Sequence, residues 1–199
     1  QTVKHIPGNI PVIGDAKRGD IGNTAKAYAK TIFSDFNFDA TTVNPYLGFD
    51  SLEPFIQYPD KGIFILCRTS NAGAVDFQSL RCVEHDRPLF EIVALKAREW
   101  NVHDNIGLVV GATYPEELKL IRQNHPDMPL LIPGIGAQGG DPELTIRYGV
   151  DVRGEKAIIN SSRQIIYASR DEGFAEAARK AASKLREQIN QYRSTRTSL

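Results

Sequence analysis

The sequence predicts an α/β fold, a (β/α)8 TIM barrel, from three observations. Short apolar runs alternate with amphipathic segments along the 199 residues, which indicates a parallel sheet covered by helices. Polar and glycine-rich stretches follow the apolar runs, as they do at the catalytic face of barrels. No GxGxxG fingerprint follows the first run, so a doubly wound sheet has less support. We count six strand-helix units where a complete barrel has eight, and therefore expect 1–199 to be about the last six units of one barrel domain.

The first half of the chain alternates between strand and helix patterns. An apolar run at 10–13 predicts a buried strand, and 23–33 repeats apolar residues along one side of a helix. The run 40–43 predicts the second strand, and 51–57 predicts a short helix that begins with a serine cap. The run 62–67 is the clearest buried strand, because it is apolar throughout.

The second half continues the same alternation. Apolar residues at helical spacing predict helices at 88–101, 115–123, 141–148 and 174–189. Short apolar runs predict strands at 106–110, 130–132 and 156–160. The basic and hydroxyl-rich end, 193–199, is expected to be a flexible tail.

Composition excludes several classes of function. The 24 basic and 24 acidic residues cancel, so no net field attracts the chain to nucleic acid or to a membrane. The two cysteines have no CxxC spacing, which favours a reduced, cytoplasmic protein, and no signal peptide or bilayer-length apolar run is seen. The four histidines have no metal-ligand spacing and are expected on the surface. They are His5, His85, His103 and His125.

The first candidate site is the charged segment after the run 10–13. Asp15 and Lys17 alternate in an extended chain and should share a face, and the following turn can bring Asp20 toward both. Two carboxylates favour the charged form of the lysine, which suits a proton donor better than a Schiff base. They also make a metal site less expected, because the chain already supplies the cation. The alternative is an ion-pair cluster on the surface.

Polar residues after three later strands form further candidates. Gln138 stands among four glycines in the loop 133–141, where backbone amides and a helix start can approach an anion. Arg163 follows the last strand, at the place where barrels commonly hold a phosphate. Ser70 and Asn71 follow the run 62–67 and either recognise a polar ring edge or cap a turn.

Four of these motifs together resemble orotidine 5'-phosphate decarboxylase. They are the segments 15–24, 69–74 and 133–141 and Arg163, in that order along the chain. The segment 42–48 resembles the longer bacterial subfamily. The resemblance implies a (β/α)8 barrel that converts orotidine monophosphate to uridine monophosphate without metal or organic cofactor. It also implies that Lys17 protonates C6 of the pyrimidine and that Asp15 lies against the departing carboxylate.

The same resemblance implies roles for the remaining candidates. It implies a homodimer in which Asp20 and Thr24 contribute to the site of the neighbouring subunit. Ser70 would contact the pyrimidine edge. Gln138 and Arg163 would hold the 5'-phosphate, and the glycine loop would close over it as a lid.

The resemblance does not extend to the first two strands of the family. Family members have two earlier strands, which carry an aspartate that contacts the ribose and a second catalytic lysine. Neither is in this sequence, so we expect 1–199 alone to be inactive and prone to aggregate through exposed strand edges.

Two other functions stay open at this point. Magnesium-dependent keto-gulonate phosphate decarboxylases and hexulose phosphate synthases share the Asp-x-Lys-x-x-Asp pattern. A non-catalytic nucleotide-binding remnant is the second alternative. The segments 20–24 and 70–73 favour the nucleotide decarboxylase over both.

Overall fold

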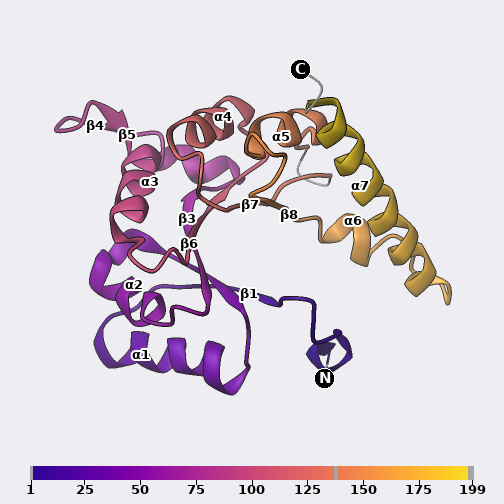
Figure 1. The fold of residues 1–199 in the computed structure, drawn as a ribbon, viewed down its shortest axis with the longest axis horizontal. Coiled ribbons are helices and arrows are strands. Elements are labelled where there is room, and N and C mark those ends of the chain that lie inside the picture. The colour runs from indigo at the N-terminus through magenta and orange to yellow at the C-terminus, as the bar shows by residue number, and fades with distance from the viewer. Residues whose placement is uncertain (1, 137–138, 197–199) are drawn as a thin grey trace. The chain divides into compact units, whose positions relative to one another are not determined.

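Strands and helices alternate along the chain in the computed structural model, which describes residues 2–136 and 139–196 (Figure 1). The larger sheet has the strand order β1-β2-β3-β6-β7-β8, which is also the order of these strands in the sequence. The pairs β1–β2, β2–β3 and β7–β8 are parallel. Parallel strands joined by helices define the α/β class, so the predicted fold class is confirmed.

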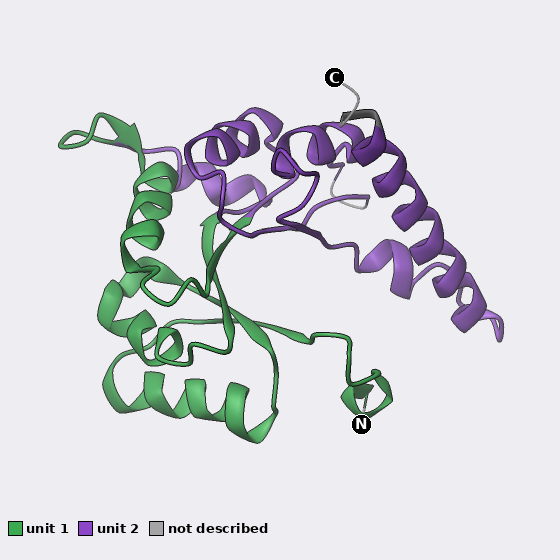
Figure 2. Ribbon diagram, viewed as in Figure 1, with its two compact units in different colours: residues 1–67, 82–109 green, residues 68–81, 110–199 purple. Residues whose placement is uncertain are grey.

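The chain divides into two compact units, which are described separately (Figure 2). Unit 1 comprises Gln1–Cys67 and Cys82–Val109. Unit 2 comprises Arg68–Arg81 and Val110–Leu199. Three strands cross the boundary, because β3 ends at Arg68, β4 comprises Arg81 and Cys82, and β6 ends at Val110.

Unit 1 is built on four strands: β1 (Ile13–Arg18), β2 (Ala40–Val43), β3 (Gly62–Arg68) and β6 (Ile106–Val110). Its helices are α1 (Gly22–Lys30), the π-helical turn η2 (Thr31–Asp35), α2 (Phe49–Ile56) and α3 (Leu89–Trp100), with short 3-10 turns η1 (Thr2–His5) and η3 (Pro45–Leu47). Its core contains fully buried apolar side chains from α2, β3 and β6: Leu52, Phe55, Ile63, Ile65 and Leu108. The predicted strands 40–43 and 106–110 have the observed bounds.

The first strand lies further along the chain than the run 10–13 predicted. Pro11 has no N–H, and the Val12 N–H donates to the Asp39 carboxylate at 2.7 Å instead of to a neighbouring strand. β1 therefore begins at Ile13 and includes Asp15 and Lys17, rather than ending before them.

The predicted serine cap of α2 is also wrong. The helix begins two residues earlier, at Phe49, after Gly48 with φ +89°. A glycine adopts this backbone conformation without the strain that a side chain would add. The Ser51 hydroxyl lies within the first turn and donates to the Gly48 carbonyl oxygen at 2.6 Å.

Unit 2 contains the strands β7 (Leu130–Ile132) and β8 (Ala157–Ile159) and the helices α4 (Pro115–Asn124), α5 (Pro142–Gly149), α6 (Arg163–Ile166) and α7 (Phe174–Arg196). A 3-10 turn, η4 (Ala72–Asp76), also belongs to unit 2. The short strands β4 (Arg81–Cys82), which spans the boundary, and β5 (Arg87–Pro88), which belongs to unit 1, form a separate two-stranded sheet. The sequence analysis did not predict η4, this small sheet or α6. Helix α7 continues through 193–196, within the segment expected as a tail, and 197–199 lie outside the described residues.

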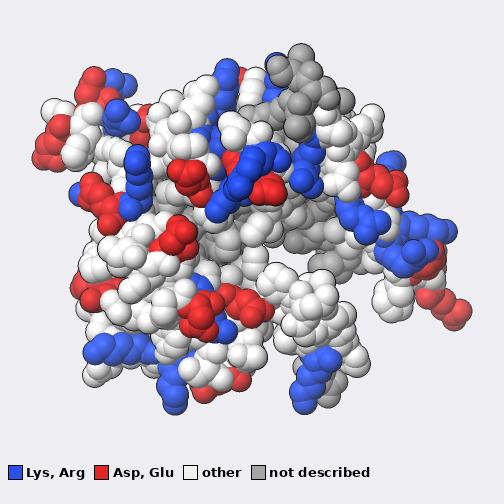
Figure 3. Space-filling view, in the orientation of Figure 1, with Lys and Arg blue, Asp and Glu red and all other residues white. Residues whose placement is uncertain are grey.

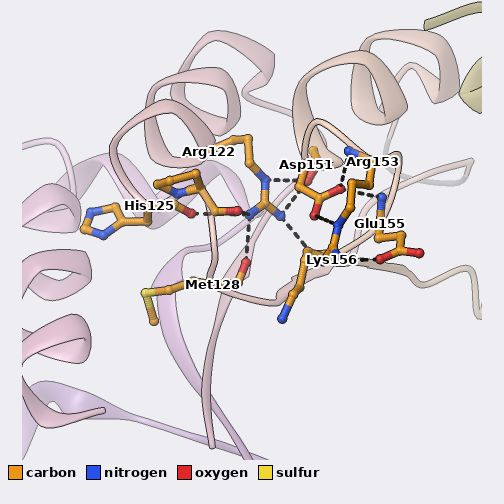
Figure 4. Close-up of polar contacts among 9 residues, drawn as sticks. Arg122, His125, Met128, Asp151, Arg153, Glu155 and Lys156 are labelled. Atoms are coloured by element: carbon orange, nitrogen blue, oxygen red, sulfur yellow. Dashed lines mark hydrogen bonds and ion pairs between the residues drawn. The ribbon is translucent and has the colours of Figure 1, made fainter. Parts of the chain in front are cut away.

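Arg122 of α4 connects several backbone segments of unit 2 (Figure 4). The five N–H groups of its buried guanidinium make six contacts of 2.7 to 3.3 Å with five carbonyl oxygens, and one N–H of Nη1 is shared between two acceptors. The acceptors belong to His125, Pro126, Met128, Gly149 and Lys156. A single side chain thereby satisfies carbonyls at the end of α4, before β7, at the end of α5 and before β8.

His125 is buried, so the expectation that all four histidines lie on the surface is wrong for this residue. It directly follows α4, and its carbonyl oxygen accepts one of the Arg122 hydrogen bonds at 3.3 Å. The other three histidines are exposed, as expected.

Asp151 closes the turn between α5 and β8. Its Oδ1 accepts hydrogen bonds from the N–H groups of Arg153 and Glu155 at 2.9 and 2.8 Å (Figure 4). Burial by itself would raise the pKa of this carboxyl. The two backbone hydrogen bonds and the charges of Arg153 and Arg122 outweigh burial, so the pKa of Asp151 lies below its ordinary value.

Candidate active site

Lys17 and Asp15 form a close ion pair within β1. The Lys17 Nζ lies 2.6 Å from Oδ1 and 2.5 Å from Oδ2 of Asp15. The prediction that these two side chains share a face is confirmed by this contact. Their side chains remain 52% and 63% exposed, so the pair can be reached by a ligand.

An irregularity in the sheet brings the two groups together. The register of β1 against β2 shifts between Gly14 and Arg18, and Lys17 adopts a left-handed backbone conformation with φ +48°. This conformation is unfavourable for a residue with a side chain and is common at sites where a protein must direct a side chain. It places the Lys17 amine back over the carboxylate two residues earlier.

Thr42 of β2 connects to both members of the pair, and the sequence analysis did not identify it. Its hydroxyl donates to Asp15 Oδ1 at 2.8 Å and accepts from the Lys17 backbone N–H at 2.9 Å. Thr42 is 1% exposed, so both bonds are anchored on a buried hydroxyl. One hydroxyl therefore fixes the orientation of the carboxylate and of the lysine backbone together.

Asp20 and Thr24 lie on the segment after β1, without a recorded hydrogen bond or ion pair to Lys17 among the described residues. Asp20 Oδ1 accepts from the Ile21 N–H at 2.8 Å, and Thr24 is exposed on the first turns of α1. The expected approach of Asp20 to Asp15 and Lys17 is not observed within this chain. Asp20 is half-buried, and Thr24 is exposed.

Ser70 follows β3 and belongs to unit 2, where the backbone around it is held by several neighbours. The Thr113 hydroxyl donates to the Ser70 carbonyl oxygen at 3.2 Å. A Cβ on Gly111 would lie 2.8 Å from backbone and side-chain atoms of Ser70, so only a glycine permits this approach. The serine is half-buried at the end of a central strand.

Described residues of the glycine loop in unit 2 bond to one another. The Gly140 N–H donates to the Gly134 carbonyl oxygen at 3.0 Å, and the Gly139 N–H donates to Gly136 at 2.9 Å. Gly134, Gly136 and Gly139 all have positive φ, which explains why the loop is rich in glycine. Asp141 caps α5 by accepting from the Leu144 N–H at 3.0 Å.

Of the two residues predicted to bind phosphate, Arg163 and Gln138, the structure describes only Arg163. Arg163 is the first residue of α6 and is exposed, four residues after the end of β8. It makes no recorded ion pair with another described residue. Gln138 lies outside the described residues.

Charge is distributed without a large region of one sign on the face that Figure 3 shows, where acidic and basic side chains are intermingled. Among residues 2–136 and 139–196, no helix combines the length and apolar character needed to span a bilayer.

Comparison with known proteins gives consistent matches along nearly the whole chain. A model of the "Orotidine 5'-phosphate decarboxylase / HUMPS family" matches residues 1–180. The orotidine 5'-phosphate decarboxylase of Dehalococcoides mccartyi strain 195 is 55% identical over 195 residues, which are 97% of this chain and 72% of that protein. The enzyme of the same name from Ralstonia nicotianae is 56% identical over 188 residues, or 94% of this chain and 68% of that protein.

Solved structures show the same similarity. Leishmania donovani OMP decarboxylase superposes with a TM-score of 0.82 at 42% identity, covering 94% of this chain and 72% of that chain. Leishmania donovani UMP synthase superposes with a TM-score of 0.84 at 44% identity, covering 94% of this chain and 41% of that chain. These matches support the barrel form of the α/β fold, of which this chain represents a part.

Proposed function

The chain belongs to the orotidine 5'-phosphate decarboxylase / HUMPS family, and on this basis we propose that its protein converts orotidine 5'-phosphate to uridine 5'-phosphate in pyrimidine biosynthesis. The family includes sugar-phosphate enzymes as well, so membership alone does not select the substrate. The curated relatives at 55 and 56% identity, however, are orotidine 5'-phosphate decarboxylases. This similarity favours the nucleotide as the substrate.

In this proposal Lys17 is the proton donor. The bond between C6 and the carboxyl carbon breaks, its electron pair remains on C6, and carbon dioxide leaves. A proton from the Lys17 ammonium then completes the C–H bond at C6. A fixed cation next to a developing carbanion stabilises the transition state more than the ground state, which is the requirement for catalysis.

The observation that carries this proposal is the contact of Lys17 Nζ with both carboxylate oxygens of Asp15. An amine held by a neighbouring anion has a defined position and lacks the freedom of an ordinary surface lysine. Asp15 would also lie against the substrate carboxylate, where repulsion between the two anions favours loss of carbon dioxide.

The remaining predicted residues would bind the rest of the nucleotide. Ser70 would contact the pyrimidine edge, and Gln138 and Arg163 would hold the 5'-phosphate through charge-assisted hydrogen bonds. Asp20 and Thr24 would contribute to the neighbouring site of a homodimer. The exposure of Thr24 supports this proposal.

We further propose that the reaction requires neither a metal nor an organic cofactor. The experiment is an assay of the protein that carries this chain, with orotidine 5'-phosphate as substrate, with and without EDTA and with added magnesium. We expect formation of uridine 5'-phosphate and carbon dioxide at the same rate in all three conditions.

The two alternatives give different results in the same assay. Turnover of a hexulose phosphate or keto-gulonate phosphate that stops with EDTA would assign the protein to the magnesium-dependent branch. Binding of uridine 5'-phosphate without any turnover would assign it as a nucleotide-binding protein. Either result would overturn the proposed function.

A further inference from the structure

A partly buried polar cluster in unit 2 contacts the segment that carries Ser70. Its central residue is Arg68, which ends β3 and whose side chain is only 1% exposed. The Arg68 Nε donates to Glu117 Oε2 of α4, and its guanidinium carbon lies 3.8 Å from the centre of the Tyr114 ring. Nη1 of Arg68 also reaches Gln78 Oε1 at 3.4 Å.

Gln78 connects Arg68 to Thr69, the residue before Ser70, through hydrogen bonds. Its Oε1 accepts from the Thr69 backbone N–H at 2.8 Å, and its Nε2 donates to the Thr69 hydroxyl at 2.8 Å. The Thr69 hydroxyl in turn donates to Asn71 Oδ1 at 2.6 Å. The amide oxygen and nitrogen of Gln78 therefore bond to the backbone and the side chain of Thr69. The Thr69 hydroxyl extends this series of hydrogen bonds to Asn71.

The loop after β6 holds the same segment from the other side. The Gly111 N–H donates to the Arg68 carbonyl oxygen at 2.7 Å, and the Thr113 hydroxyl donates to the Ser70 carbonyl oxygen. Between them, the Ala112 N–H donates to the Pro133 carbonyl oxygen at 2.8 Å, at the start of the glycine loop. The position of Ser70 is thus fixed from two directions by residues of its own unit.

Stability alone does not account for such a cluster. Removing the Arg68 guanidinium from water costs free energy that attraction to a carboxylate seldom exceeds, and apolar residues of similar size often serve as well. A buried polar network is better explained where it fixes one geometry of a segment. The segment fixed here contains the serine that the proposed function assigns to the pyrimidine.

We propose that Arg68, Gln78 and Glu117 are positioning residues that fix the Ser70 hydroxyl for recognition of the pyrimidine ring. This inference rests on the proposed function and adds to it the residues that determine selectivity for the base. The cluster acts through Thr69 and the Ser70 backbone and does not itself contact the nucleotide. Its loss should therefore weaken ligands that contain the base and leave base-free phosphates unaffected.

The test compares uridine 5'-phosphate with ribose 5-phosphate by calorimetry on the protein that carries this chain. Gln78→Leu removes both hydrogen bonds to Thr69, and Thr69→Val removes the hydroxyl at nearly constant shape. Each should weaken uridine 5'-phosphate about tenfold, as expected for one or two lost hydrogen bonds, with ribose 5-phosphate unchanged. The matched control Thr69→Ser keeps the hydroxyl and should bind both ligands like the wild type. These variants avoid Arg68, whose replacement could prevent folding.

A double-mutant cycle decides whether the cluster acts through Ser70. Ser70→Ala alone should also weaken uridine 5'-phosphate, and adding Gln78→Leu to it should cause little further loss, because the two changes remove the same interaction. Additive losses, or equal losses for ribose 5-phosphate and uridine 5'-phosphate, would overturn the positioning role. Failure of the wild type to bind uridine 5'-phosphate would instead overturn the proposed function.

Discussion

The amine of Lys17 lies within 2.6 Å of both carboxylate oxygens of Asp15, two residues earlier in the same strand. A regular strand would leave these side chains parallel, but the left-handed backbone of Lys17 and the register shift against β2 turn the amine onto the carboxylate. Backbone strain of this kind persists only where the surrounding structure maintains it. Here the buried Thr42 hydroxyl bonds to both residues.

Replacement of Lys17 by alanine should abolish decarboxylation while the fold survives. The loss of a positioned proton donor is expected to lower kcat by at least about 10²- to 10⁴-fold. The side chain is half-exposed, so its removal leaves no cavity in the core. Steady-state kinetics measures the loss of decarboxylation, and far-UV circular dichroism checks that the fold survives. Lys26→Ala, an exposed lysine of α1, is the control, and near-normal turnover of Lys17→Ala would refute the assigned role.

Replacement of Thr42 by valine should lower kcat more than it changes KM. Valine has nearly the same shape but leaves Asp15 Oδ1 and the Lys17 N–H without their buried partner, which predicts a loss of about tenfold or more. Thr42→Ser retains the hydroxyl and should restore most of the activity. Thr41→Val removes the neighbouring hydroxyl, which donates to the Gly14 carbonyl oxygen at 2.8 Å, and serves as the second control. An equal loss in Thr41→Val and Thr42→Val would show a general effect on the sheet.

Replacement of Arg163 by alanine should weaken phosphorylated ligands. A charge-assisted hydrogen bond to phosphate typically contributes about 1.5 to 3 kcal/mol, so the Kd of uridine 5'-phosphate should rise about tenfold to a hundredfold. Uridine, which has no phosphate, should bind equally to both proteins. Calorimetry measures each affinity, and Arg170→Ala provides an exposed arginine as the control. Unchanged affinity for the nucleotide in Arg163→Ala would contradict the phosphate role.

The sequence predicted the strands well where an apolar run had clear polar borders. Residues 106–110 and 130–132 are examples, because burial on both faces requires a continuous apolar run. The shared face of Asp15 and Lys17 was predicted from their spacing. The left-handed conformation of Lys17 was not, since it depends on pairing with a strand more than twenty residues away in sequence.

The buried polar residues were not predicted. Arg68 and Arg122 resemble ordinary surface arginines in the sequence, because the groups that satisfy them come from distant parts of the chain. Glu117 is 49 positions from Arg68, and the Lys156 carbonyl is 34 positions from Arg122. Thr42 stands in a run where both threonines are buried, so alternation did not indicate which hydroxyl faces Asp15. The one feature of the sequence that could have indicated a special role for Arg68 was its position directly after the apolar run 62–67 and before Thr69.

Replacement of Arg122 by methionine should strongly destabilise the protein. The change removes the six contacts and leaves five carbonyl oxygens without this donor. A buried acceptor that loses its donor typically costs about 1 to 3 kcal/mol, so several such losses should lower the free energy of unfolding by more than one ordinary surface substitution does. Urea unfolding measures the difference, and Arg147→Met, an exposed arginine of α5, should change stability by less than about 0.5 kcal/mol. Equal stability of the two variants would contradict the structural role of Arg122.

Asp151 should make the stability of the protein depend on pH in the acidic range. Its pKa in the folded protein lies below the ordinary value, since the backbone hydrogen bonds and the charges of Arg153 and Arg122 outweigh burial. The folded state therefore favours the carboxylate, and the stabilisation is fully present above the unfolded pKa of about 3.9 and is lost as pH falls through the folded pKa.

Comparison with Asp151→Asn isolates this contribution. We expect the variant to be less stable than the wild type at pH 7, and the difference in urea midpoint to shrink as pH falls below about 4. Asp127→Asn, at an exposed aspartate of the same unit, should follow the wild-type pH dependence. A difference between Asp151→Asn and the wild type that stays constant from pH 7 to below about 3 would show that the carboxylate charge contributes nothing, because protonation removes that charge in the wild type.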